Sequence, residues 1–139
     1  MLKAGFSKVC ISPPIGAPLA GFAAREGVSA GIHDDLYARA LVVSNESVAF
    51  ALVSVDLLAL PSEFVKRLRR GIQSKTGIYG DAVMIASTHT HAGPVTIRTF
   101  FNPEESVDAG YMNFLAAAIE ESVSHAWRDR FPARVGVGV

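Results

Sequence analysis

The sequence is poor in cysteine and has no excess of either charge. It contains one cysteine, Cys10, among 139 residues, which excludes an intrachain disulfide and a cysteine-based zinc site. Lysine and arginine together number 13, aspartate and glutamate also number 13, and the formal net charge is +0. This balance gives no electrostatic reason to expect a nucleic acid or an anionic membrane as a partner.

A long uninterrupted apolar run is also missing. A bilayer-spanning helix needs roughly 18 or more consecutive apolar residues, and the longest apolar stretch, residues 48–60, is interrupted by Ser54 and Asp56. Met1 leads directly into an alternating strand pattern, without the basic and apolar regions of a signal peptide. We therefore expect no transmembrane segment and a cytoplasmic location, or a secreted one if a leader has been removed.

The sequence is nevertheless rich in apolar residues. Half of them (50%) are hydrophobic and the mean hydropathy is +0.30, which is high for a soluble domain of this size. This composition indicates either strands that are buried on both faces or a surface that something else covers. A chain of this length fits one domain with its own core, so we expect a single domain over residues 1–139.

Apolar residues recur at strand and helix spacings along most of the chain. Strand-like runs cover residues 6–11, 36–44, 48–60, 82–87 and 134–139. Helical stripes follow two capping candidates, Ser62 and Asp108. The runs over 36–44 and 48–60 flank a polar turn and indicate a hairpin, and the second run is apolar on both parities, as in a central strand. The order predicts an α/β layered domain with a mixed β-sheet flanked by two main helices.

The sharpest chemical signal is a pair of histidines in the segment 87–94, which reads Ser-Thr-His-Thr-His-Ala-Gly-Pro. In an extended chain, His89 and His91 point to the same face, about 6–7 Å apart. Both can then bind one metal ion, or one binds the ion while the other meets the substrate or a bound water. The simpler alternative is two histidines whose ring nitrogens are satisfied by buried hydrogen bonds.

Several neighbours of the histidine pair are candidate supporting residues. Thr88 and Thr90 point to the opposite face of an extended chain and can fix the backbone by hydrogen bonding. Gly93 and Pro94 turn the chain sharply and leave room for a ligand, so we expect them to line a pocket.

Two further residues have two interpretations each. Asp56 is either a carboxylate that orients His89 without touching the metal itself or a turn cap before the first helix. His33 follows a glycine-rich loop and either lines the mouth of a pocket or lies on the surface.

Four stretches resemble, in the same order, the neutral/alkaline non-lysosomal ceramidase family. The segment 88–94 is similar to the family's Thr-His-Thr-His-Ser-Gly-Pro, with Ala92 in place of serine. The segments 4–14, 31–40 and 53–58 resemble the family's opening strand and turn, its second signature, and the strand before its first helix. The resemblance covers nearly the whole chain.

The resemblance implies a zinc-dependent amidase that cleaves the N-acyl bond of sphingoid lipids, with this chain as the N-terminal portion of the catalytic domain. It implies that His89 is a ligand of one Zn²⁺ ion, and that His91 is a catalytic residue beside the metal. The family's other zinc ligands and its proposed serine nucleophile would lie beyond residue 139. The partner implied is a lipid-like N-acyl amide substrate, and the missing ligands come from a further C-terminal segment or a homo-oligomer.

Two other classes of protein remain as alternatives. An amidohydrolase-like metal hydrolase also carries His-x-His at a strand end, but such barrels need about 250 residues. A truncated or degenerate domain without catalysis of its own is the non-enzyme alternative.

Overall fold

The computed structural model describes residues 1–98 and 106–138. Its elements, in chain order, are β1 (Lys3–Cys10), β2 (Tyr37–Ser44), β3 (Ala49–Val55), α1 (Ser62–Thr76), the short 3₁₀ turn η1 (Gly80–Ala82), β4 (Val83–Ser87), α2 (Ala109–Arg128) and β5 (Phe131–Pro132).

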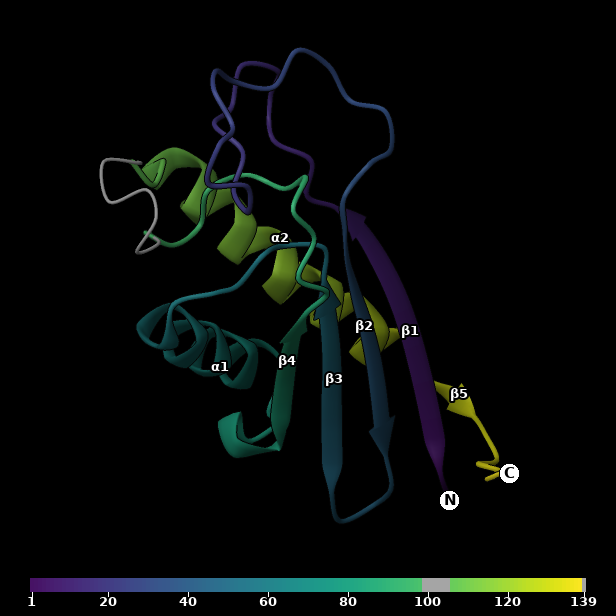
Figure 1. Ribbon diagram of the computed structural model, residues 1–139. Helices are drawn as coiled ribbons and strands as arrows, with labels where there is room; N and C mark the ends of the chain where they lie inside the picture. The colour runs from purple at the N-terminus through teal and green to yellow at the C-terminus, as the bar shows by residue number, and fades with distance from the viewer. Residues whose placement is uncertain (99–105, 139) are drawn as a thin grey trace.

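The strands form one mixed sheet in the order β4-β3-β2-β1-β5 (Figure 1). β2 is antiparallel to both β1 and β3, while β3 and β4 are parallel. The hairpin expected between β2 and β3 is confirmed. Its turn is held by Asn45, whose side-chain oxygen accepts hydrogen bonds from the backbone N–H groups of Ser47 and Val48, both at 2.8 Å. The mixed α/β fold predicted from the sequence is therefore confirmed.

Both helices pack against the same face of the sheet. That face consists of alternate strand residues, which are fully buried in β2 and β3: Ala38, Ala40, Val42, Ala51, Val53 and Val55. The helices contribute apolar stripes to the same core: Phe64, Leu68 and Ile72 from α1, and Leu115, Ile119 and Val123 from α2. Gly5 of β1 lets α2 approach closely, because a Cβ at this position would lie 1.9 Å from the carbonyl oxygen of Ala126.

The opposite face of the sheet is open and apolar. Phe6, Leu41, Leu52 and Met84 are paired in register across four adjacent strands. Their exposed fractions are 61%, 39%, 36% and 53%. We call these four residues the outer row. The expectation that β3 is buried on both faces is therefore wrong for the described residues, because the two helices cover only one side. The apolar composition instead reflects an apolar surface, the other alternative that the sequence left open.

Three element boundaries bear on the sequence-based predictions. Helix α1 begins at Ser62 and follows Pro61, so Ser62 is the first helical residue rather than the cap. Asp108 is confirmed as the cap of α2, because its carboxylate accepts a hydrogen bond from the backbone N–H of Tyr111 at 2.8 Å. The strand expected over 134–139 is wrong for residues 134–138, which form no strand and remain exposed; residue 139 lies outside the described residues.

Within the part of the chain that is described, no helix is long and apolar enough to span a membrane.

The topology brings the histidine motif to one edge of the sheet. Because β3 and β4 are parallel, their carboxyl ends lie side by side, and residues 88–98 continue from that edge. The long loop from Ile11 to Leu36 gathers at the same end of the molecule, above the ends of β1 and β3 (Figure 1). Sites in open α/β sheets are commonly built at the carboxyl ends of the strands.

Candidate active site

His89 lies two residues after β4 in a backbone conformation that residues other than glycine rarely adopt. Its φ is 64°, and it is the one non-glycine residue with positive φ among residues 1–98 and 106–138. The backbone N–H groups of Thr88 and His89 donate to the carbonyl oxygens of Val55 and Leu57, at 2.9 and 3.0 Å. The extended geometry expected for the histidine pair is therefore wrong, because the chain turns at His89 to stay bonded to the segment after β3. Left-handed conformations of bulky residues cluster at functional sites.

The ring of His89 is oriented by a backbone carbonyl. Its Nδ1 lies 2.9 Å from the carbonyl oxygen of Leu58. Since a carbonyl only accepts, Nδ1 carries the proton, and in the neutral imidazole Nε2 keeps its lone pair. Histidines that bind metals are commonly held in this way through their second ring nitrogen.

The two imidazoles do come together, although by a different route from the one expected. The ring centroids of His89 and His91 are 5.1 Å apart, with an angle of 69° between the ring planes. On its other side, His91 meets the ring of Phe22 edge to face at 5.1 Å. Arg25 donates a hydrogen bond to the carbonyl oxygen of His91 at 2.8 Å. Sequence reasoning did not single out Phe22 or Arg25.

Asp56 does not have the role that the sequence suggested. Its Oδ2 accepts hydrogen bonds from Arg39 Nη1 at 2.7 Å and from the backbone N–H of Tyr37 at 3.0 Å. The acceptor that orients His89 is instead the Leu58 carbonyl oxygen. Asp56 links the end of β3 to the start of β2, so it neither orients His89 nor caps the turn before α1.

The remaining residues of the motif divide between surface and interior. Thr88 is exposed, and Thr90 is half-buried. The Thr90 hydroxyl accepts a hydrogen bond from the backbone N–H of Ala92 at 3.3 Å. Gly93 and Pro94 are buried, because they pair with the loop before them. The backbone N–H of Ala20 donates to the Gly93 carbonyl oxygen at 2.9 Å.

A hollow of about 450 Å³ adjoins the motif, and Thr90, Ala92 and His33 are among the residues that line it. The His33 side chain is 97% exposed, and its Nδ1 lies 2.7 Å from the Asp34 carboxylate. His33 therefore lies both on the surface and at the rim of this hollow. Gly93 is not among the residues that line it.

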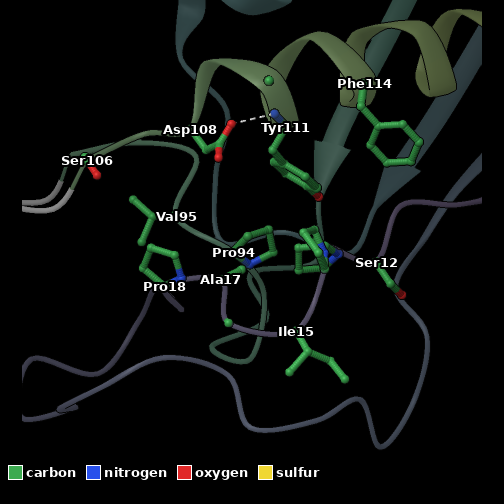
Figure 2. A pocket seen from close by; sticks show the side chains of 14 residues that line it. Ser12, Ile15, Ala17, Pro18, Pro94, Val95, Ser106, Asp108, Tyr111 and Phe114 are labelled. Atoms are coloured by element: carbon green, nitrogen blue, oxygen red, sulfur yellow. Dashed lines mark hydrogen bonds between the residues drawn. The ribbon is translucent and has the colours of Figure 1, made fainter.

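A second hollow, of about 530 Å³, lies between the proline-rich loop and the start of α2. All five of the following residues line this space, and Figure 2 shows Tyr111 and Phe114 on the helix and Pro18, Pro94 and Val95 on the loops. The Tyr111 hydroxyl donates to the carbonyl oxygen of Ile11 at 2.7 Å. Burial raises the pKa of Tyr111 far above its usual range, so the phenol stays neutral and acts as a structural donor. Pro94 was expected to line a pocket and does so, but nothing in the local pattern indicated the helix side of this hollow.

The donor set fits part of a zinc site. Two imidazoles are suitable zinc ligands, but a zinc site needs three or four protein ligands. Across residues 1–98 and 106–138, no group of three or more histidine, cysteine, aspartate or glutamate side chains could hold a metal ion. The residues present can therefore hold a zinc ion only together with donors from elsewhere.

Comparison with known proteins gives consistent matches. A family model described as neutral/alkaline non-lysosomal ceramidase, N-terminal, matches residues 3–138. The neutral ceramidases of Drosophila melanogaster and Drosophila pseudoobscura pseudoobscura are each 35% identical over 100 residues, which is 66% of this chain and 14% of theirs. The crystal structure of neutral ceramidase from Pseudomonas aeruginosa superposes with a TM-score of 0.80 at 24% identity, covering 94% of this chain and 22% of that chain. A ceramidase complexed with C2 gives a TM-score of 0.75 at the same identity and coverage.

The fold and the matched sequence place the chain in the class of proteins that carry a ceramidase-type N-terminal domain. Within that class, the chain belongs to the neutral/alkaline non-lysosomal ceramidase family, as the four sequence stretches had indicated. It spans 14% of the length of the fly relatives and 22% of the solved bacterial chain.

Proposed function

We propose that this chain contributes the His-x-His part of a zinc-dependent site that hydrolyses the amide bond of a lipid-like N-acyl substrate. The observation that carries the proposal is the hydrogen bond between His89 Nδ1 and the Leu58 carbonyl oxygen, at 2.9 Å. It leaves the lone pair of Nε2 available to bind a metal at the carboxyl ends of the parallel strands β3 and β4, and membership in the ceramidase family supports the same role.

The two histidines have different roles in this proposal. His89 would hold the metal through Nε2. A zinc ion, when bound, supplies Lewis acidity that polarises an amide carbonyl. His91, with its ring centroid 5.1 Å from that of His89, is close enough to hold or move a proton beside the scissile group. The remaining ligands come from a further segment of a longer chain or from a second copy of this one.

Zinc binding tests the metal role in three proteins, each joined to the polypeptide that follows the matched region in its longer relatives: the wild type, His89→Ala and the control His125→Ala. His125 lies on α2, where its Nε2 is 3.2 Å from Glu121, so its loss should leave the site intact. We expect His89→Ala to weaken zinc binding in equilibrium dialysis by more than about tenfold, since even the loss of a residue that only orients a ligand lowers metal affinity roughly 10–100-fold. Equal affinity in all three proteins would contradict the metal role.

Hydrolysis is tested on a fluorescent N-acyl sphingosine, with the chain joined to the polypeptide that follows the matched region in its longer relatives. We expect turnover in the wild type and in His125→Ala, and loss of turnover in His89→Ala and His91→Ala. Zinc binding without turnover would favour the non-catalytic alternative, for which the incomplete ligand set among the described residues is the supporting observation. The barrel alternative does not fit the sheet, because the only parallel pair in the described strand order is β3 with β4.

A further inference from the structure

His91 lies between β4 and α2, outside any helix or strand, so its position depends on side-chain and loop contacts. These contacts come from a segment about seventy residues earlier in the chain, residues 18–25. The segment first runs beside the motif: the backbone N–H of Ala20 donates to the Gly93 carbonyl oxygen at 2.9 Å, and that of Val95 donates to the Pro18 carbonyl oxygen at 3.1 Å. It then folds over His91.

Arg25 joins the two segments through both arms of its guanidinium. Nη1 donates to the carbonyl oxygen of Ala20 at 3.0 Å, and Nη2 donates to that of His91 at 2.8 Å. The same guanidinium lies over the Phe22 ring, with its central carbon 4.9 Å from the ring centroid. A planar, forked cation suits this task, because it makes two directed hydrogen bonds and stacks on an aromatic ring at once.

Gly21 allows this approach for two reasons. Its φ is 110°, a backbone angle that residues other than glycine rarely adopt. A Cβ at this position would also lie 2.5 Å from Cγ of His91. Any side chain at residue 21 would therefore displace the His91 ring. Phe22 then meets that ring edge to face, at 5.1 Å between the centroids.

We propose that Arg25 is a positioning residue for His91, and that together with Phe22 it sets the orientation of the His91 ring relative to His89. The two histidines have separate anchors: the Leu58 carbonyl oxygen holds His89, whereas residues 21–25 hold His91. Positioning of His91 and metal retention by His89 are therefore separable. The catalytic meaning of this inference rests on the proposed function, but the positioning itself does not.

The test compares imidazole NMR signals in Arg25→Lys, Arg25→Gln, Phe22→Leu and Phe22→Tyr. Lysine keeps the charge but lacks the planar fork, glutamine removes the charge, and tyrosine keeps the ring that leucine removes. We expect both Arg25 variants and Phe22→Leu to shift the His91 signals, and to shift the His89 signals less, since the His89 ring keeps its own anchor at the Leu58 carbonyl oxygen. Phe22→Tyr keeps the aromatic ring, so its His91 signals should stay close to those of the wild type. The control is Arg70→Gln, at an exposed arginine on α1, and the unfolding midpoint of each variant shows that it is folded.

The outcomes separate this inference from the proposed function. If the His91 signals in the Arg25 variants and Phe22→Leu move no more than in Arg70→Gln, the positioning role is overturned. The assembled protein is the chain joined to the polypeptide that follows the matched region in its longer relatives. Where it hydrolyses amides, Arg25→Gln should lower kcat with little change in KM or in zinc content, whereas His89→Ala should lose zinc. If the assembled protein hydrolyses nothing, the proposed function fails, while the NMR comparison still decides the role of Arg25.

Discussion

At the scale of single residues, Tyr111 shows how burial fixes a protonation state. Its ring is buried at the start of α2, and its hydroxyl donates to the Ile11 carbonyl oxygen at 2.7 Å. Burial is the larger cause that raises the pKa of this phenol, and the nearby Cys10 acts in the same direction. The folded protein therefore retains a proton that the unfolded chain releases near tyrosine's ordinary pKa, about 10.

This difference predicts a loss of stability in alkali. Above about pH 10 the unfolded state binds fewer protons than the folded state, so the free energy of unfolding falls as pH rises, by up to about 1.4 kcal/mol per pH unit. Below that pH, both states are protonated at Tyr111 and the effect is absent. Urea unfolding between pH 9 and roughly pH 11.5 measures this slope. Tyr111→Phe should flatten it, whereas Tyr79→Phe, at an exposed tyrosine, should not; equal slopes in both variants would contradict the assignment.

The residues of the site were only partly predictable from the sequence. The histidine pair was evident because its spacing and its place after an apolar run are local features. The acceptor for His89 is a backbone carbonyl, that of Leu58, and backbone groups leave no mark on residue identity. Arg25 was missed because its contact with His91 joins residues 66 apart. Asp56 was given the wrong partner because proximity in an expected fold does not decide which of several donors a carboxylate meets.

At the scale of elements, the positions of the helices and strands followed well from apolar periodicity and from the Asp108 cap. Which face of β3 would be covered did not, since a strand that is apolar on both parities carries no signal for the side on which helices pack. The strand expected at 134–138 has suitable alternation, but these residues have no neighbouring strand with which to pair in the described structure.

Gly5→Ala tests the approach of α2 to β1. An added Cβ would lie 1.9 Å from the Ala126 carbonyl oxygen, so the helix must move away or the strand must bend. Overpacking of this kind costs about 1–3 kcal/mol, and we expect the free energy of unfolding in urea to fall by that amount. Gly136→Ala is the matched control, because no atom of the described residues lies within 4 Å of its added Cβ. A loss no greater than that of the control would show that α2 is not held against β1 at this point.

At the scale of the whole molecule, the sheet has one packed face and one open apolar face. The outer row of Phe6, Leu41, Leu52 and Met84 is continuous across four strands. Contiguous apolar surfaces of this kind are uncommon on monomers and are prone to association. The apolar composition that the sequence could not assign to core or surface therefore belongs partly to this face.

Neighbouring residues of β3 allow the two faces to be compared directly. Leu52 belongs to the outer row, while Val53 is fully buried beneath the helices. We expect Leu52→Thr to reduce binding of an apolar dye and self-association, and to change the free energy of unfolding by less than about 0.5 kcal/mol. Val53→Thr should lower that free energy by about 1–3 kcal/mol, because it buries a hydroxyl. Equal destabilisation by both variants would indicate that the outer face is covered in solution.

The bridge made by Arg25 also bears on the time at which the site appears during folding. The β2–β3 hairpin closes around Asn45 through contacts between near neighbours, whereas the Arg25 to His91 contact closes a separation of 66 residues. Contacts between distant residues carry a larger chain-entropy cost and form more slowly. The hairpin should therefore precede the site, and the edge-to-face arrangement of Phe22 and His91 marks a chain that has finished folding rather than one that has only collapsed.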